Sequence, residues 1–248
     1  MGPKYALYEE DKIDASIISV LSHSEVALDN NTWLVDLAPD STNSASFRFT
    51  KRAFDLFGVL LVSPLLVPLL LMVTALVKLT SAGPAFFSHR RICRDGEFFS
   101  MFKFRTMVVD SSAVLEQYFR LHPEALSEWQ TTHKLRCDPR VTPLGRVLRR
   151  LSLDELPQIW NVIKGQMSLV GPRPIVAAEV EKYGQSFHVY TAVNPGITGL
   201  WQVSGRSLLT YEERVELDCR YVLTFSVWQD IKILAMTAWA VVSQEGAY

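Results

Sequence analysis

Two adjacent carboxylates, Asp154 and Glu155, stand close to three arginines in this sequence of 248 residues. Arg149 and Arg150 precede the acids, and Arg173 follows them between two prolines. In proteins, carboxylates hold divalent cations or act as nucleophiles, and guanidinium groups pair with phosphate oxygens. The pattern therefore indicates metal-assisted chemistry on a phosphate ester.

A purely structural role is an alternative for the same acids. Ser152 and Glu155 have the spacing of a helix capping box, in which Asp154 would be a first-turn acid that suits the helix dipole. Pro157 weakens this alternative, because proline prefers the first position of a helix. The two interpretations are compatible, since the start of a helix also binds phosphate.

The sequence lacks the ligand patterns of a zinc site and favours magnesium instead. The sequence has no GxGxxG, GxxxxGK(S/T) or Asp-x-Asp motif, and its five histidines are scattered. Cys93, Cys137 and Cys219 lack metal-ligand spacing and are expected to be reduced thiols in a cytosolic compartment. Mg²⁺ takes one or two carboxylates together with substrate phosphates, so it suits Asp154 and Glu155.

A long apolar segment, residues 53–77, lies upstream of the acids and contains a single charge, Asp55. As a straight helix it would be ~38 Å long, which exceeds the hydrocarbon core of a bilayer. The pair Ser63-Pro64 near its middle, with Pro68 beyond, predicts a sharp bend. The Ser63 hydroxyl is placed to satisfy a carbonyl that the bend frees, which matters where water is absent.

Two membrane topologies are consistent with this segment. A transmembrane span is favoured by length alone. A re-entrant hairpin, broken at Ser63-Pro64, is favoured because cations flank both ends, and such residues concentrate on the cytoplasmic face. The flanking cations are Arg48, Lys51 and Arg52 before the segment, and Lys78, Arg90, Arg91 and Arg94 after it.

Charge divides the chain into two regions. Residues 1–46 carry eight acids against two lysines and read as an acidic, mobile N-terminal extension without a cleavable signal peptide. Residues 47–248 are basic, with 23 cations and 18 acids, and form the expected catalytic domain. A basic body favours an anionic partner, either a membrane surface or a nucleotide. No nucleic-acid partner is expected.

The remaining patterns predict a mainly helical α+β fold. Residues 84–107 predict short strands around an Asp95-Gly96 turn, a small β-hairpin. Helical periodicity covers residues 111–133, 211–221 and 226–242, whereas residues 193–206 predict a glycine-punctuated loop. The last helix is amphipathic, and its apolar face suits either the core or a membrane interface.

The chain resembles a known family over about 200 residues, from Lys51 to the C-terminus. The family is that of the bacterial sugar transferases, also called monotopic phosphoglycosyl transferases or polyprenyl-phosphate hexose-1-phosphate transferases. In overall similarity the sequence is nearest to exopolysaccharide-priming galactosyl- and glucosyl-phosphate transferases. The motifs that carry the resemblance are KRAFD, Ser63-Pro64, KFRTM, DPRVTPLGRVLRRLSLDELPQ, SLVGPRP, PGITGLWQVSGR and WQDIKIL.

The resemblance implies a re-entrant membrane helix, interfacial helices and a location at the cytoplasmic face of the bacterial inner membrane. It also implies transfer of hexose 1-phosphate from a UDP-sugar to undecaprenyl phosphate, with Mg²⁺ and release of UMP, as the first membrane step of exopolysaccharide assembly. Galactose is slightly favoured over glucose. Other partners are membrane lipids, downstream glycosyltransferases or a second copy of the chain.

The resemblance also implies residue roles. Asp154 matches the nucleophile that becomes covalently bound to the phosphosugar, and Glu155 binds or orients the metal. The substrate-binding residues are Arg149, Arg173, Lys103, Arg105 and Arg206, and Asp230 joins Asp154 and Glu155 as a candidate metal ligand.

Two other functions are alternatives to this enzyme. A membrane-anchored scaffold that recruits later glycosyltransferases would not need the intact set of acids and arginines. A Mg²⁺-dependent hydrolase of UDP-sugars would release sugar phosphate without any lipid product.

Overall fold

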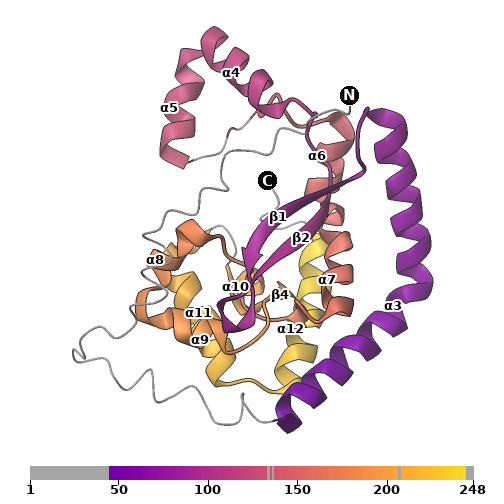
Figure 1. The fold of residues 1–248 in the computed structure, drawn as a ribbon, viewed down its shortest axis with the longest axis vertical. Helices are drawn as coiled ribbons and strands as arrows, with labels where there is room; N and C mark the ends of the chain where they lie inside the picture. The colour runs from indigo at the N-terminus through magenta and orange to yellow at the C-terminus, as the bar shows by residue number, and fades with distance from the viewer. Residues whose placement is uncertain (1–44, 133–134, 136, 206–207, 244–248) are drawn as a thin grey trace, which may run out of the picture. The chain divides into compact units, whose positions relative to one another are not determined.

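The computed structural model describes residues 45–132, 135, 137–205 and 208–243, which all belong to one unit, Ala38–Tyr248. The fold is mainly helical, as predicted, with two small two-stranded sheets (Figure 1). Almost all of the expected extension, residues 1–46, lies outside the described residues. Cys93, Cys137 and Cys219 are free thiols, as predicted.

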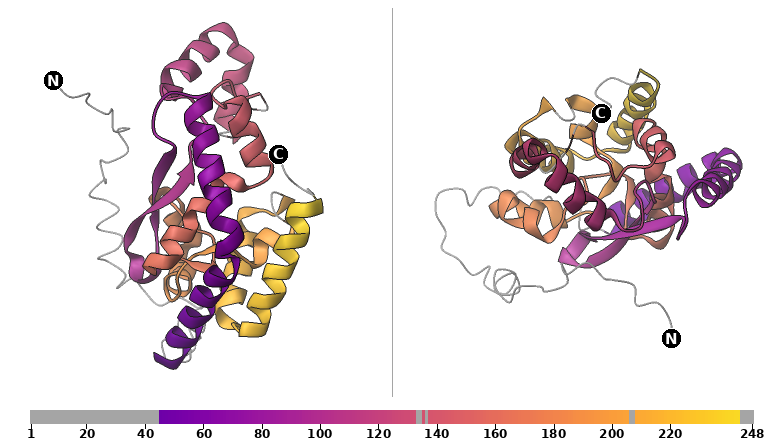
Figure 2. Two further views of the ribbon diagram at one scale, coloured as in Figure 1. Left: turned by 90° about the vertical axis from the view of Figure 1, so that its right-hand side faces the viewer. Right: turned by 90° about the horizontal axis from the view of Figure 1, so that it is seen from above.

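The apolar segment lies within one long helix, α3 (Ala45–Thr80), which continues through Pro64 and Pro68. The helix bends near its middle, and its two ends point far apart, unlike the antiparallel legs of a hairpin (Figures 1 and 2). Ser63 Oγ donates a hydrogen bond to the Leu60 carbonyl at 2.8 Å. Pro64 cannot donate to that carbonyl, so the predicted role of the Ser63 hydroxyl is confirmed. The expected break is therefore a bend within a continuous helix.

Most of the apolar surface of α3 is exposed. Only 11% of its most apolar window is buried, and the helix is long and apolar enough to cross a membrane. Leu60, Leu61 and Leu65 are each about 70–80% exposed. A water-soluble protein would not present so large an apolar face, so α3 is suited to a lipid environment.

The first sheet is the antiparallel pair of β1 (Phe86–Ile92) and β2 (Phe98–Phe104), joined through the short 3₁₀ turn η3 (Arg94–Gly96). Asp95 and Gly96 have φ values of 61° and 76°, the left-handed conformation that an Asp-Gly turn favours. The predicted hairpin is thus confirmed. Phe99 and Met101 of β2 pack into a core cluster with Val59 of α3.

The second sheet was not expected. It pairs β3 (Ser168–Val170) in parallel with β4 (Gly196–Thr198), inside the region predicted as a loop. A Cβ on Gly196 would lie 2.1 Å from the Gly171 nitrogen, so glycine permits this close approach. The loop prediction is therefore wrong for residues 196–204, which also contain a short helix, α10 (Leu200–Ser204).

Most of the other helices lie around these sheets, whereas α4 (Ser111–Leu121) and α5 (Pro123–Thr132) stand together at one end (Figure 1). The single helix predicted at 111–133 is two helices, because Pro123 cannot continue the first one and instead begins the second. The C-terminal helices agree closely with the prediction. The full set comprises α4, α5, α6 (Pro143–Arg150), η4 (Leu153–Gln158), α7 (Ile159–Lys164), η5 (Ala177–Glu179), α8 (Val180–Tyr183), η6 (Gly184–Ser186), α9 (Phe187–Thr191), α11 (Tyr211–Leu223) and α12 (Val227–Ser243).

Helix α12 divides its apolar residues between the core and the surface. Ile233 is buried in a cluster with Tyr221 and Val222 of α11. Trp228 and Trp239 are 74% and 71% exposed. One side of the helix therefore packs in the core, and another side exposes two tryptophans, a distribution that suits a membrane interface.

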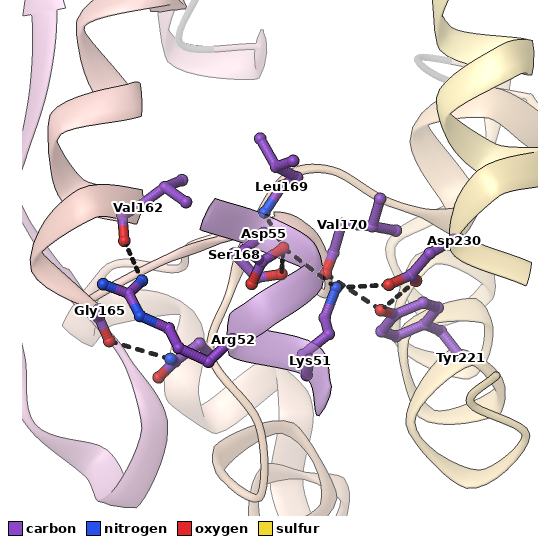
Figure 3. A network of polar contacts seen from close by, with 11 residues as sticks. Lys51, Arg52, Asp55, Val162, Gly165, Ser168, Leu169, Val170, Tyr221 and Asp230 are labelled. Atoms are coloured by element: carbon purple, nitrogen blue, oxygen red, sulfur yellow. Dashed lines mark hydrogen bonds and ion pairs between the residues drawn. The ribbon is translucent and has the colours of Figure 1, made fainter. Parts of the chain in front are cut away.

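Charged side chains near the N-terminal end of α3 join it to the rest of the protein (Figure 3). The Asp55 carboxylate is 3% exposed and accepts hydrogen bonds from the Ser168 hydroxyl (2.9 Å) and the Leu169 amide (3.1 Å). Lys51 Nζ lies 2.5 Å from Asp230 Oδ2 and 3.5 Å from Asp55 Oδ1. One lysine thus links α3, α12 and, through Asp55, the β3 strand.

Two further contacts complete this docking. The Tyr221 hydroxyl lies 2.7 Å from Asp230 Oδ1 and 3.0 Å from the Val170 carbonyl oxygen, between α12 and β3. The Arg52 guanidinium donates to the Val162 and Ile163 carbonyls at the end of α7. Buried polar groups are costly unless paired, so this network specifies where α3 joins the body.

Replacing Asp55 by alanine should lower the free energy of unfolding by about 3 kcal/mol, because Lys51 and two hydrogen-bond donors would lose their partner. The measurement is denaturant unfolding of the detergent-solubilised protein, followed by circular dichroism. Glu116→Ala is the matched control, since its ion pair with Arg120 is on the surface, with the Glu116 side chain 68% exposed. Equal stability losses in the two variants would contradict a structural role for Asp55.

Candidate active site

The acid pair lies in η4 (Leu153–Gln158). The residue before this 3₁₀ helix, Ser152, has a φ of 55°, which is left-handed. A capping residue needs an extended conformation, and Ser152 makes no side-chain capping hydrogen bond. The capping-box interpretation is therefore wrong. Glu155 is directed instead to a residue distant in sequence.

That partner is Lys103, near the end of β2. Its Nζ lies 2.6 Å from Glu155 Oε1, and the two side chains are 22% and 26% exposed. Burial by itself would raise the pKa of Glu155, but the charges of Lys103 and Arg173 outweigh it and lower that pKa. Glu155 is therefore ionised at neutral pH.

The pKa of Asp154 is shifted in the opposite direction from that of Glu155. Burial, and next the negative charge of Glu155, raise its pKa to about 6, against the opposing effects of Lys103 and Arg149. Neighbouring carboxyl groups whose pKa values are driven apart are typical of sites where the two groups have different tasks. At neutral pH Asp154 is a carboxylate of unusually high basicity.

Helix α6 places Arg149 close enough to Asp154 for its charge to lower the pKa of that acid. The helix is capped by Thr142, whose hydroxyl accepts a hydrogen bond from the Gly145 amide at 2.9 Å. Arg149 Nε donates to Thr106 Oγ1 at 2.9 Å, which links the helix to the KFRTM segment. A Cβ on Gly145 would lie 2.1 Å from the Thr106 carbonyl oxygen, so only glycine allows this approach.

Arg173 is exposed in the Gly-Pro-Arg-Pro turn after β3. Its charge lowers the pKa of Glu155, which places the guanidinium within electrostatic reach of the acid pair. The same guanidinium lies 5.7 Å from the centre of the Trp201 ring. The structure thus brings together Asp154, Glu155, Lys103, Arg149 and Arg173, which are five of the residues singled out from the sequence.

The remaining predicted site residues lie elsewhere. Arg105 is 8% exposed and donates to the Ser81 carbonyl (2.8 Å) and hydroxyl (2.7 Å), in the connection that follows α3. Arg206 lies outside the described residues. Asp230 belongs to the docking network of Figure 3, where both its oxygens have partners. Ser63 and Pro64 lie within α3.

The described part of the chain contains no cluster of three or more acidic, histidine or cysteine side chains that could hold a metal ion. Asp230 therefore does not join Asp154 and Glu155 in one ligand group. The two adjacent carboxylates remain a donor set of the kind that Mg²⁺ uses when substrate phosphates supply the other ligands.

Sequence reasoning missed Arg91 as a site residue. Its guanidinium approaches the same group of charges, because the charges of Arg173 and Glu155 both act on its pKa. The strand register could have revealed it. With the turn at Asp95-Gly96, Arg91 pairs with Phe99 and Phe87 pairs with Lys103, so Arg91 and Lys103 lie on the same face of the ribbon.

Comparison with known proteins adds independent information. The profile of a family described as "Bacterial sugar transferase" matches residues 46–244. A UDP-galactose-lipid carrier transferase of Erwinia amylovora is 48% identical over 82% of this chain and 42% of its own length. The exopolysaccharide production protein ExoY of Rhizobium meliloti is 47% identical over 80% of this chain and 88% of its own length.

A third relative is an undecaprenyl-phosphate galactose phosphotransferase of Salmonella typhimurium, 46% identical over 82% of this chain and 42% of its own length. The chain thus spans less than half of the Erwinia and Salmonella proteins, but most of ExoY.

The contact between α6 and Thr106 gives a test of how the site is positioned. Gly145→Ala should lower the free energy of unfolding by about 2 kcal/mol, because the added methyl group overlaps backbone atoms and pushes α6 away. Gly58→Ala is the control, since its methyl group would meet only the flexible end of the Leu169 side chain. Thermal unfolding of both variants is the measurement. A Gly145→Ala protein as stable as the wild type would show that α6 does not depend on this approach.

Proposed function

Because this chain belongs to the bacterial sugar transferase family, we propose that it transfers hexose 1-phosphate from a UDP-sugar to undecaprenyl phosphate and releases UMP. The observation that carries the proposal is the pair Asp154 and Glu155, one carboxyl with a raised pKa and one held ionised by cations. The relatives' names support the substrates, since they include undecaprenyl-phosphate phosphotransferases and an exopolysaccharide production protein. Polysaccharide assembly would begin with this step.

The proposed reaction has two displacements at one phosphorus atom. The Asp154 carboxylate attacks the phosphorus next to the sugar, a P–O bond breaks, and UMP leaves with the bonding electrons. An oxygen of undecaprenyl phosphate then attacks the same phosphorus and releases the Asp154 carboxylate. A covalent intermediate divides a difficult transfer between two anions into two easier steps.

The surrounding residues suit each requirement of this chemistry. Asp154 is ionised at neutral pH but more basic than an ordinary aspartate, which favours attack on phosphorus. Arg149 and Arg173 would pair with phosphate oxygens and reduce the repulsion between anions. Glu155 would hold Mg²⁺ together with Asp154, and the ion, when bound, would neutralise charge on the transferring phosphoryl group.

The donor sugar we propose is galactose. Three of the relatives are named for galactose: those of Erwinia and Salmonella are 48% and 46% identical, and one from Streptococcus agalactiae is 43% identical. Two others, from Komagataeibacter xylinus and Escherichia coli, are named for glucose and are 43% and 38% identical.

The membrane arrangement we propose is re-entrant without antiparallel legs: the bent, continuous helix α3 would enter and leave the bilayer at the cytoplasmic face. The support is the bend near Ser63-Pro64, the exposed apolar surface and the cations at both ends of the apolar segment. A soluble donor and a lipid acceptor could then meet at the interface. The active site would be held at that depth by the contacts of Lys51 and Asp55.

Asp154→Asn should lower lipid-dependent UMP release by about 1000-fold or more, because the amide is not a nucleophile. The assay uses the purified protein in detergent with Mg²⁺, undecaprenyl phosphate and either UDP-galactose or UDP-glucose. Asp95→Asn, in the β1–β2 turn, is the control and should retain wild-type activity. Substantial activity in Asp154→Asn would remove Asp154 from the nucleophilic role, and release of UDP instead of UMP would indicate simple glycosyl transfer.

The raised pKa of Asp154 predicts the pH dependence of the reaction. Below about pH 6 the carboxyl group of the free enzyme is protonated, so kcat/KM should fall about tenfold for each further pH unit. Above that pH the carboxylate is present and the rate should level off. The measurement is kcat/KM for the donor between pH 4.5 and 8 at constant Mg²⁺. A constant value down to pH 4.5 would contradict a raised pKa.

A further inference from the structure

We propose that Arg91 is a further substrate-binding residue, which together with Arg173 binds phosphate oxygens at the acid pair. This inference rests on the proposed function, because it assumes that the site receives phosphate groups. It adds a residue from β1, an element that the sequence did not connect with the site.

The position of Arg91 follows from the β1–β2 ribbon. Phe99 pairs with Arg91, and Phe99 and Lys103 lie on one face of β2. Phe99 is buried in the core cluster, whereas Lys103 reaches Glu155 at the edge of that cluster. Arg91 and Lys103 therefore lie on the same face of the ribbon, one on each strand, and the charges of both lower the pKa of Glu155.

Contacts fix part of the Arg91 side chain beside the turn that carries Arg173. Arg91 Nη1 donates to the Pro174 carbonyl at 3.3 Å and lies 3.6 Å from Glu179 Oε2. Pro174 is the residue directly after Arg173, so this hydrogen bond holds the Arg91 guanidinium beside the segment that carries Arg173. The positive charge of Arg173, after burial, is the next largest cause of a lowered pKa for Arg91.

The positive charges of Arg91 and Arg173 repel each other, and two of the carboxylates near them already have other partners. Glu155 pairs with Lys103, and the Glu179 carboxylate also accepts a hydrogen bond from the Val176 amide at 2.9 Å. A phosphate group with two or more ionised oxygens would offset the repulsion between the two guanidinium groups.

Arg91 also has an unused donor. Its Nε is buried and, among the described residues, has no hydrogen-bond partner. Buried donors of native proteins are nearly always satisfied, by protein, water or ligand. Because a guanidinium presents its donors as a planar fork, Nε is suited to a phosphate oxygen. A bound phosphate would supply the hydrogen-bond acceptor that Arg91 Nε lacks.

The phosphate could come from either substrate, the diphosphate of the nucleotide sugar or the phosphate of the lipid acceptor. Both present the same ionised oxygens. Binding of UDP tests the first source, with uridine as the ligand that lacks phosphate. The KM for undecaprenyl phosphate in the UMP-release assay tests the second source.

The experiment compares Arg91→Gln with wild type and with Arg94→Gln, using the full chain in detergent. Arg94 is the matched control, because it lies three residues away and pairs only locally with Asp95. Titration calorimetry with UDP and with uridine measures affinity. We expect Arg91→Gln to weaken UDP binding at least tenfold, or to raise the KM for undecaprenyl phosphate at least tenfold, while uridine binding is unchanged. A variant that matches wild type in both measurements would overturn the proposal.

A conservative variant covers the case in which Arg91→Gln does not fold. Arg91→Lys keeps the charge but loses the planar fork, so phosphate affinity should lie between those of wild type and Arg91→Gln. If Arg91→Gln is unfolded and Arg91→Lys binds both substrates as wild type does, the proposal is overturned. Failure of the proposed function is a separate result, since the wild-type protein itself would then release no UMP.

Discussion

The buried charge network of Lys51, Asp55 and Asp230 is the constraint on which the rest of the structure depends. It attaches a helix with an exposed apolar surface to a body that carries the charged site. Hydrophobic contacts alone would not distinguish one register of such an apolar helix from another. Asp55 does so, because its carboxylate must meet the Ser168 hydroxyl and Leu169 amide or remain buried without partners.

The same strand connects this network to the site. Ser168 and Leu169 hold Asp55 at the start of β3, and the turn after β3 presents Arg173 to the acid pair. A displacement of α3 would therefore be transmitted over a few residues to Arg173. The attachment of α3 and the start of the segment that carries Arg173 thus belong to one continuous group of contacts.

The sequence predicted local features well and tertiary pairing poorly. The β-hairpin was predictable because Asp95 and Gly96 favour the left-handed turn by their own chemistry. The parallel strands β3 and β4 were not, since each has three residues and exists only by pairing with a segment far along the chain. The capping box failed for a similar reason: Lys103 of β2 competes for Glu155, and no local pattern reveals that contact.

The sequence by itself determined the family, the apolar helix and the role of the Ser63 hydroxyl, and it predicted the acid pair as the reactive groups, because these depend on residue type and short spacing. Only the tertiary structure decided that Asp154 and Glu155 have different pKa values, that Asp230 serves the docking of α3, and that Arg91 lies beside the segment that carries Arg173. Electrostatic effects depend on burial and on charges brought from distant segments. Folding alone brings Lys103, Arg149 and Arg173 around the acids.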